Sequence, residues 1–239
     1  MAGELQGRTA LVTGASRGIG LAVARELVAA GAWVAMVARS AEPLARAAAE
    51  AGGHAIPADI STPEGVHTLA TYVGELLGDA PDLIVSAAGA FSLAWLHEAA
   101  PEDFDRQLSA NLRGPFLLMR AFLPGMLRRG SGHFVTIGSV AGRNAFAQNG
   151  GYAASKFGVR GLHEVLRAEV RGSGVRATLI EPAATDTPLW DPIDPDTRAD
   201  LPSRASMLRP EDVSRAVLFA ASQPPGVQIS CIAVEAAGG

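Results

Sequence analysis

The sequence predicts an α/β fold: a doubly wound, parallel, seven-stranded sheet in one domain, with helices on both faces. Short apolar runs alternate with longer amphipathic segments along the whole 239-residue chain. No Gly/Ser-rich linker, charge run or internal repeat divides the sequence. Because 48% of the residues are hydrophobic, the chain can bury a large core. We therefore expect residues 1–239 to form a single domain.

The apolar runs predict buried strands at residues 8–13, 33–37, 54–57, 83–86, 133–138, 175–181 and 228–234. The segments between them predict helices near residues 18–31, 41–52, 62–78, 102–130, 151–172 and 210–222. The third helix begins after Ser61-Thr62-Pro63-Glu64, which has the serine, early proline and glutamate of a capping box. Pro210 opens the last helix, and Glu211 and Asp212 follow at the positive end of its dipole.

Residues 185–208 break this alternation. The segment contains several aspartates and four prolines, which oppose a long helix, at Pro188, Pro192, Pro195 and Pro202. An irregular insert of this length is commonly a lid or a binding loop. We predict a substrate lid, because the segment follows a strand at the edge of the sheet that should carry the ligand. A simple surface excursion is the alternative.

Composition excludes several classes of protein. A net charge of −4 and a pI of about 5.7 give no basic face for nucleic acid. The apolar stretch from Ala10 to Ala38 is interrupted by charged residues, so we expect no membrane span, and the N-terminus lacks the features of a secretory signal. Cys231 is the only cysteine, which excludes an internal disulfide and argues against a metal site. These features predict a soluble cytoplasmic protein.

A glycine-rich turn joins the first strand to the first helix. Thr13-Gly14-Ala15-Ser16-Arg17-Gly18-Ile19-Gly20 permits a tight turn and a close approach of the backbone to a pyrophosphate. The free N–H groups at the start of the helix can then receive the anion. The sequence therefore predicts a Rossmann-type nucleotide site, with contacts from Gly14, Ser16, Arg17, Gly18, Ile19 and Gly20.

Two arginines indicate which dinucleotide is bound. The second strand ends at Ala38-Arg39-Ser40, where an enzyme specific for NAD would carry an acid for the adenosine ribose. Ala38 leaves that space free, and Arg39 can contact a 2′-phosphate with Arg17 on its other side. The sequence predicts NADP(H) rather than NAD(H), although either arginine could instead be a solvated surface group.

Lys156 is the only lysine in the chain, and it lies four residues after Tyr152, one of two tyrosines. On a helix this spacing places both side chains on one face. A free phenol has a pKa near 10, and a nearby ammonium group would lower it toward the neutral range that acid–base catalysis needs. The pair thus predicts a proton-transfer site. The alternatives are a chance lysine and a half-buried core tyrosine.

The order of these motifs resembles the classical short-chain dehydrogenase/reductase family. After the glycine turn come Ser86-Ala87-Ala88-Gly89, then Asn111, Ser139, Tyr152-Ala153-Ala154-Ser155-Lys156, Pro182-Ala183 and Thr187. The resemblance implies that Tyr152 donates or accepts the proton and that Lys156 also binds the nicotinamide ribose. It further implies that Ser139 polarises the substrate oxygen, and that Asn111 anchors a water chain behind the lysine. The alternatives are that Ser139 only ends a strand and that Asn111 only bends a helix.

The same resemblance implies further cofactor contacts, at Ser40, Asp59, Ile60, Ala87, Ala88, Gly89, Pro182, Thr185 and Thr187. Asp59 would contact the adenine, but a role in capping a helix is the alternative. The chain departs from the family pattern where Glu181 replaces a small polar residue and Ala183 a glycine. Ser86 and Ala87 stand where two asparagines are usual.

Substrate contacts are expected on loops that follow strands, at Phe91, Trp95, Ser139, Val140, Phe146, Gln148, Leu189 and Trp190. This mainly apolar set suits an acyl, aliphatic or aromatic ketone. Arg128 and Arg129 could dock an acyl carrier protein, or they could simply suit a helix C-terminus. The last strand lacks the Thr-Gly of reductases that act on acyl carrier protein. The segment from Leu208 to Val213 is more similar to family members that oxidise small 3-hydroxy acids with NADP.

The sequence therefore predicts an NADP(H)-dependent carbonyl or secondary-alcohol oxidoreductase, either similar to 3-oxoacyl-[acyl-carrier-protein] reductases or similar to small 3-hydroxy acid dehydrogenases. The rival hypothesis is a non-catalytic NADPH-binding sensor or scaffold. Family resemblance implies a homotetramer built on the helices near 102–130 and 151–172.

Overall fold

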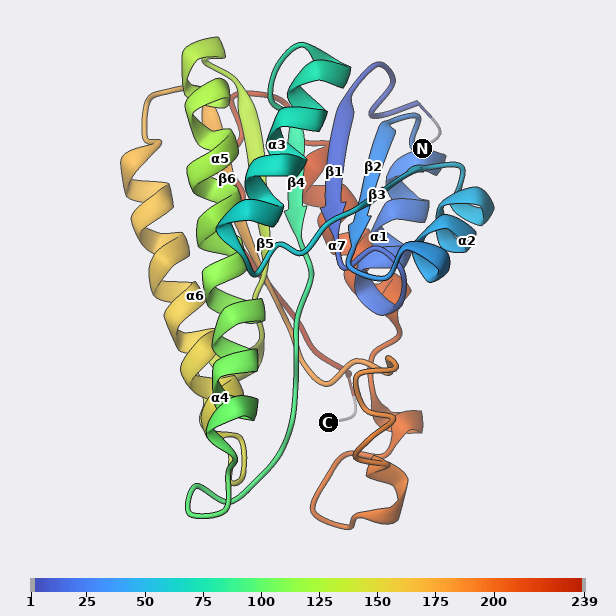
Figure 1. The fold of residues 1–239 in the computed structure, drawn as a ribbon, viewed down its shortest axis with the longest axis vertical. Helices are drawn as coiled ribbons and strands as arrows, with labels where there is room; N and C mark the ends of the chain where they lie inside the picture. The colour runs from blue at the N-terminus through green and yellow to red at the C-terminus, as the bar shows by residue number, and fades with distance from the viewer. Residues whose placement is uncertain (1–2, 238–239) are drawn as a thin grey trace.

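Seven parallel strands form one sheet in the order β3-β2-β1-β4-β5-β6-β7 (Figure 1). The computed structural model describes residues 3–237, so the outermost residues of the predicted domain lie outside this range. The strands are β1 (Thr9–Thr13), β2 (Trp33–Ala38), β3 (His54–Pro57), β4 (Leu83–Ser86), β5 (Gly132–Ile137), β6 (Val175–Pro182) and β7 (Cys231–Val234). The predicted α/β fold, a Rossmann-type doubly wound parallel sheet, is confirmed.

The α-helices are α1 (Gly18–Ala29), α2 (Ala41–Ala51), α3 (Pro63–Leu77), α4 (Pro101–Leu108), α5 (Gly114–Arg129), α6 (Gly150–Glu169) and α7 (Pro210–Ala221). Three short 3₁₀ turns are η2 (Val140–Gly142), η3 (Pro195–Thr197) and η4 (Arg204–Ser206). One π-helical turn, η1 (Ser109–Arg113), separates α4 from α5, so the helix predicted over 102–130 is not continuous. Such turns often occur at functional sites, and η1 contains Asn111.

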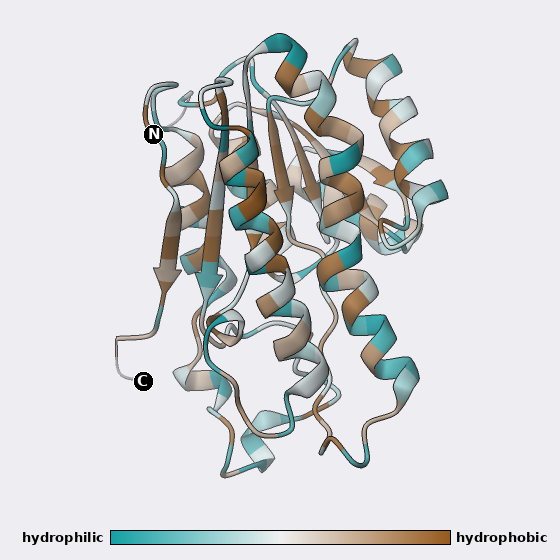
Figure 2. Cartoon of the chain, turned by 90° about the vertical axis from the view of Figure 1, so that its left-hand side faces the viewer, coloured by the Kyte–Doolittle hydropathy of each residue, from teal (hydrophilic) through white to brown (hydrophobic). Residues whose placement is uncertain are grey.

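Two apolar cores lie on the two faces of the sheet. Leu27 of α1, Leu44 of α2 and Val217 of α7 belong to the first core. Leu69 of α3 and Leu118 of α5 belong to the second, on the opposite face. In Figure 2 the strands are hydrophobic along their length, whereas each helix has a polar and an apolar side. This pattern is expected of a parallel sheet that is covered on both faces.

Two details of the predicted elements are corrected. The N-cap of α3 is Thr62, whose Oγ1 accepts a hydrogen bond from the Gly65 backbone N–H at 3.0 Å. Glu64 is then the second helical residue, too early to complete a capping box. The last strand starts at Cys231 rather than Gln228 because the Gln228 side chain bonds the Ala177 backbone in place of a strand ladder, at 3.3 and 2.6 Å.

At the start of α7 the predicted acidic cap is present. Asp212 accepts a hydrogen bond from the Arg209 backbone N–H at 2.8 Å. Within residues 3–237 no helix has the combination of length and apolarity that crossing a membrane requires.

The sheet order places its switch point beside β1, which pairs with β2 on one side and β4 on the other. The connection from β1 to β2 passes through α1 on one face of the sheet, and the connection from β3 to β4 passes through α3 on the other face. In doubly wound sheets such a switch point is where a ligand binds, outside the carboxyl ends of the strands, and we call this edge the crevice. The glycine turn, the loop after β4 and the loops after β5 and β6 all leave the sheet at this edge.

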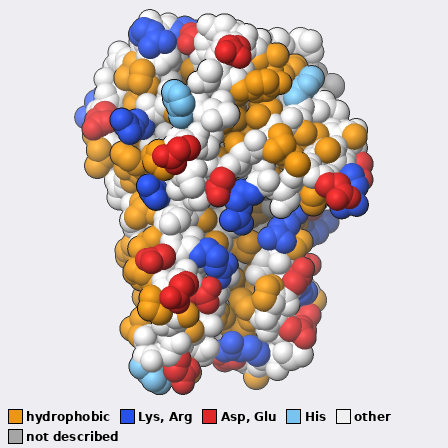
Figure 3. Space-filling view, in the orientation of Figure 1, with side chains coloured by type: hydrophobic (Ala, Val, Ile, Leu, Met, Phe, Trp, Pro, Cys, Tyr) orange, Lys and Arg blue, Asp and Glu red, His pale blue; other side chains and the backbone are white. Residues whose placement is uncertain are grey.

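The outer side of the layer formed by α4, α5 and α6 is apolar. Large apolar side chains are 40% to 52% exposed there, at Phe104, Phe116, Phe157 and Val165. A surface cavity of about 320 Å³ lies on the same side, lined by Leu108, Ser109, Leu112, Arg113, Phe116 and Leu162. Figure 3 shows apolar side chains along this side, at the lower left of the view.

Two glycines give opposite predictions for stability. Gly174 has φ +84, and a Cβ there would lie 2.0 Å from the Gly130 carbonyl oxygen. Gly174→Ala should therefore lower the free energy of unfolding by at least about 2 kcal/mol. Gly161 lies on the exposed side of α6, and a Cβ added there would meet no atom of another element within 4 Å. Gly161→Ala should raise that free energy by about 0.5–1 kcal/mol. Urea denaturation of both variants measures the difference, and a neutral Gly174→Ala would contradict the packing described.

Candidate active site

The glycine turn packs directly against the loop that follows β4. Gly14 has φ +68, and a Cβ there would lie 2.8 Å from the Ala88 Cα. At Gly20 a Cβ would lie 2.4 Å from the Gly14 carbonyl oxygen. The helix α1 begins without a side-chain cap, since its N-cap residue is Arg17. Bare backbone and uncapped N–H groups at a helix start fit the pyrophosphate of a dinucleotide.

Thr13, the last residue of β1, ties this turn to the β4 loop. Its Oγ1 accepts hydrogen bonds from the backbone N–H groups of Ala87 at 3.1 Å and of Ala88 at 3.2 Å. Sequence reasoning missed this residue, because a threonine at the end of a strand gives no signal of a partner 74 residues away. The contact fixes the two backbone segments that line the crevice.

Arg17, the N-cap of α1, and Arg39, the residue after β2, are both exposed. Ser40, the N-cap of α2, is exposed beside Arg39. Among the described residues neither arginine forms an ion pair with a carboxylate. Asp59 accepts hydrogen bonds from Ser61 through both N–H at 2.9 Å and Oγ at 2.7 Å. Burial raises the pKa of Asp59, but these bonds and the charge of Arg39 outweigh it, so the pKa falls.

Asp59 thus stabilises the turn before α3, whose N-cap is Thr62, and its contact with the adenine stays a prediction. Ile60 is buried, and its side chain lies against Gly114 in the core. Any contact of Ile60 with a cofactor would therefore come from its backbone.

Asn111 clamps the β4 loop to helix α6. Its Oδ1 accepts from the Ala90 N–H at 2.8 Å, and its Nδ2 donates to the Ala90 carbonyl at 2.8 Å and to Ser155 Oγ at 2.9 Å. Gly89 is required beside it, since a Cβ there would lie 3.1 Å from Asn111 Oδ1. The side chain is only 2% exposed. All its protein contacts hold backbone and helix in place, a function that the sequence did not suggest.

Ser139, Tyr152 and Lys156 lie together where β5 ends and α6 begins. Lys156 Nζ donates to the Ile137 carbonyl at 3.0 Å and lies 5.5 Å from the centroid of the Tyr152 ring. Ser139 caps η2 by accepting from the Ala141 N–H at 3.1 Å, and its hydroxyl also contacts the phenol. The hydroxyl proton of Ser139 is not needed for the cap, so it can be donated elsewhere.

The pKa values of the pair differ from the prediction. Burial raises the pKa of Tyr152 to about 12, and the hydrogen bond with Ser139 offsets only part of this. Burial lowers the pKa of Lys156 to about 8. The expected acidification of the phenol is absent, because the amine bonds the Ile137 carbonyl rather than the phenol oxygen. The phenol of Tyr152 is therefore protonated at neutral pH.

Two aromatic rings lie next to the phenol. Phe91 contacts Tyr152 edge to face, with ring centroids 4.9 Å apart, and contacts Trp190 at the same distance. Trp95 and Phe146 are 49% and 55% exposed, and no ring contact joins them to this group within residues 3–237. The structure therefore brings together Phe91 and Trp190 but leaves the other two rings apart from them.

The segment 185–208 starts and ends at the same place, because Thr185 and Leu208 form a parallel bridge. Thr187 reaches the glycine turn, where a Cβ on Gly18 would lie 3.2 Å from its Cγ2. Arg204 binds Asp186 at 2.6 Å and also pairs with Asp191.

Gln148 lies where this segment meets the loop before α6. Its Oε1 accepts from Arg198 at 3.0 Å, and its backbone has φ +63. Pro182 is buried at the end of β6, and Thr185 Oγ1 donates to the Ala183 carbonyl at 3.0 Å. The residues of the predicted lid thus surround the same crevice; movement of the lid stays a prediction.

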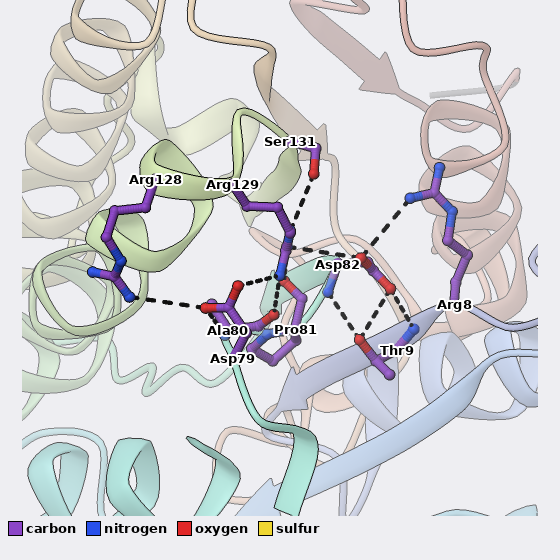
Figure 4. Close-up of polar contacts among 9 residues, drawn as sticks. All are labelled: Arg8, Thr9, Asp79, Ala80, Pro81, Asp82, Arg128, Arg129 and Ser131. Atoms are coloured by element: carbon purple, nitrogen blue, oxygen red, sulfur yellow. Dashed lines mark hydrogen bonds and ion pairs between the residues drawn. The ribbon is translucent and has the colours of Figure 1, made fainter. Parts of the chain in front are cut away.

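Arg128 and Arg129 lie at the opposite edge of the sheet, where α5 ends before β5 (Figure 4). Arg129 donates to the carbonyls of Ala80 at 2.7 Å and Pro81 at 3.3 Å, and it pairs with Asp79 at 3.2 Å. Its guanidinium is thus engaged inside the chain. Arg128 is 74% exposed and 3.9 Å from Asp79.

Among residues 3–237 no group of three or more His, Cys, Asp or Glu side chains is arranged to hold a metal ion.

Comparison with known proteins gives a family match over most of the chain. Residues 8–198 match the family described as short chain dehydrogenase. A glycine betaine reductase of Emericella nidulans is 36% identical over 98% of this chain, which spans only 19% of that longer protein. A sepiapterin reductase of Chlorobaculum tepidum is 35% identical over 90% of each chain.

A solved structure is similar along its whole length. It is a metagenomic short-chain oxidoreductase in complex with NADP, 32% identical, with a TM-score of 0.83 over 97% of this chain and 98% of that one. At this identity the likeness extends beyond the fold to the family.

The single lysine permits a direct test of the buried amine. Protein labelled with ¹³C at lysine Cε should give one signal, whose pKa lies near 8 in the folded state. In urea the same signal should titrate near the ordinary 10.5. Between these values the unfolded chain binds more protons, so the stability of the fold should rise with pH across this window. A folded-state pKa of 10.5 or above would show that the amine is solvated.

Proposed function

The chain belongs to the short-chain dehydrogenase family, and we propose that it is an NADP(H)-dependent oxidoreductase that interconverts a carbonyl group and a secondary alcohol. The observation that carries the proposal is the position of Tyr152, Lys156 and Ser139 beside the loop that contacts the glycine turn. Only two residues lie between Ala88, which lies against Gly14, and Phe91, which lies against Tyr152. A group bound along this loop would extend from the turn to the phenol.

NADPH, when bound, supplies the hydride for reduction. Tyr152 delivers the proton to the substrate oxygen, and its raised pKa keeps it protonated for this step. Ser139 donates its free hydroxyl proton to the same oxygen, where negative charge develops. Lys156 would hold the nicotinamide ribose hydroxyls and, as the phenol loses its proton, stabilise the resulting negative charge.

Arg17 and Arg39 support NADP(H) as the cofactor, since both are exposed and without an acidic partner among the described residues. A planar guanidinium suits a phosphate through paired hydrogen bonds. The NADP complex of a 32% identical structure supports the same choice.

The rings of Phe91 and Trp190 support an apolar ketone or the corresponding alcohol as substrate. The related proteins from Emericella nidulans and Chlorobaculum tepidum are both named reductases, which favours reduction. Between the two substrate classes, the engagement of Arg129 removes one of the two basic residues suggested for an acyl carrier protein. This favours a small 3-oxo or 3-hydroxy acid, or another free ketone, over a carrier-bound acyl group.

We further propose a homo-oligomer, a tetramer by family resemblance, that covers the apolar side of α4, α5 and α6. The exposed phenylalanines there would otherwise face water. A chain with one cysteine and an acidic pI suits the reducing cytoplasm, where we place its activity.

A non-catalytic NADPH sensor is the competing function. It would not require an intact proton donor, whereas this chain keeps the serine, tyrosine and lysine in contact. A panel of ketones read by loss of NADPH absorbance separates the two functions. Cofactor binding without oxidation of NADPH by any ketone would favour the sensor.

The Tyr152→Phe variant tests the proton donor. It removes only the hydroxyl, so NADPH should still bind while kcat falls by about 10²-fold or more. Steady-state kinetics and NADPH fluorescence measure the two effects. Tyr72→Phe is the control, since this exposed tyrosine is the only other one in the chain. Full turnover in Tyr152→Phe would eliminate the mechanism.

The Arg39→Asp variant tests the choice of cofactor. Loss of a charge-assisted phosphate contact should shift the preference from NADPH toward NADH by about 10- to 100-fold in kcat/KM. Arg46→Asp is the control, because Arg46 lies exposed on α2 and pairs only with Glu42. An unchanged preference would place the 2′-phosphate elsewhere.

A further inference from the structure

A carboxylate is buried inside the chain near the site, and the mechanism above does not use it. Glu181 lies one residue before the end of β6 and is only 3% exposed. Burial of a charge is unfavourable unless the charge is paired and hydrogen-bonded.

Two arginines from different elements meet this carboxylate. Arg160 of α6 bonds Oε1 at 2.5 Å, and Arg143, directly after η2, reaches Oε2 at 3.4 Å. Arg143 also pairs with Glu235 beyond β7, at 3.1 Å. The Cys231 thiol donates a longer bond to Oε2 at 3.5 Å. One side chain therefore joins a strand, a helix and a turn.

Arg160 connects the carboxylate to the helix of the proton donor. Tyr152, Lys156 and Arg160 follow one another at intervals of four residues on α6, which places them on one side of the helix. Arg160 lies one turn beyond Lys156. Its bond to Glu181 therefore restrains the rotation of α6 about its axis at the point where Lys156 must reach β5.

Arg143 connects the carboxylate to the turn of the substrate-polarising serine. Ser139 is the N-cap of η2, and Arg143 is its C-cap. The same turn lies against the helix backbone, since a Cβ on Gly142 would be 2.8 Å from the Lys156 carbonyl oxygen. Turn and helix are thus in contact, and both are bonded to Glu181.

The sheet register adds a third connection. Ile137, whose carbonyl accepts the Lys156 amine, pairs with Ile180 across β5 and β6. Glu181 is the next residue along β6. The carboxylate-bearing residue is consequently one position beyond the pair that contains the acceptor of the amine.

We infer that Glu181 is a positioning residue, whose paired carboxylate fixes the Ser139 hydroxyl relative to the Tyr152 phenol. The inference rests on the proposed function, because it concerns the two groups that would contact the substrate oxygen. Both must contact one atom, and a displacement of about 1 Å can lower a rate by about 10²-fold.

The Glu181→Gln variant, which keeps the shape of the side chain and removes its charge, tests the inference. The concentration of NADPH-binding sites is titrated by fluorescence, and kcat is expressed per site, so that misfolded protein does not count as lost activity. On this basis kcat should fall by about 10- to 100-fold, while the NADPH Kd changes by less than about threefold.

Glu164→Gln is the matched control, because Glu164 lies on α6 and pairs with Arg167 at the surface. Its kcat should not change.

A variant closer to the surface reduces the risk of misfolding, and the NMR signal of Lys156 gives a readout that does not require turnover. Arg143→Gln leaves the Arg160 pair in place and removes the tie to the turn, together with the pair to Glu235, from a side chain that is 38% exposed; it should lower kcat less than Glu181→Gln does. In protein labelled at its single lysine, Glu181→Gln should move the Lys156 ¹³Cε signal by more than its line width, and Glu164→Gln should not.

The outcomes separate the two proposals. If wild-type protein reduces no ketone, the proposed function fails, and the Lys156 signal alone still tests whether Glu181 positions the helix. If the wild type is active but Glu181→Gln keeps kcat per site within about twofold and leaves the lysine signal in place, Glu181 is not a positioning residue.

Discussion

The loop that leaves β4 is the constraint on which the rest of the site depends. Thr13 holds it from the side of β1, through the N–H groups of Ala87 and Ala88, and Asn111 holds it from the side of α6, through Ala90. Residues between these two clamps have no freedom to shift along the sheet. Phe91 emerges directly after the second clamp and lies against Tyr152. The nucleotide end and the chemical end are therefore set at a fixed separation by backbone that is bonded on both sides.

The π-helical turn η1 explains how Asn111 can serve as such a clamp. A regular helix over 102–130 would present the amide at a different angle, whereas the turn at Ser109–Arg113 rotates α4 relative to α5. Asn111 then bonds Ala90 with both its oxygen and its nitrogen, and still reaches Ser155 of α6. The π-helical turn thus connects the loop after β4 to α6 through one side chain, although these elements are far apart in sequence.

Patterns within the sequence predicted the parts of the protein that depend on local physics. Buried parallel strands are apolar runs, and six of the seven strands both begin and end within one residue of the predicted positions. The spacing of Tyr152 and Lys156 predicted their shared side of α6. Contacts across the fold were not predictable, because the bonds of Thr13, Asn111 and Glu181 join residues that only the sheet order brings together. The pKa direction of Tyr152 was wrong for the same reason, since spacing does not reveal burial.

Glu181 and Lys156 are both buried, and burial of a charged group is unfavourable unless the charge is paired. Glu181 meets two guanidinium groups, so its charge is balanced inside the protein and its position is fixed. Lys156 meets a carbonyl, which is neutral, so burial lowers the pKa of its amine to about 8. The two arginines hold the Glu181 carboxylate in place. The Lys156 amine, which bonds only a neutral carbonyl among the described residues, can gain or lose a proton at a pH near 8. The amine bonds the carbonyl of Ile137, which pairs with Ile180 on the adjacent strand, and Glu181 is the next residue. The sheet thus holds the acceptor of the titratable amine one position from the residue that carries the fixed charge.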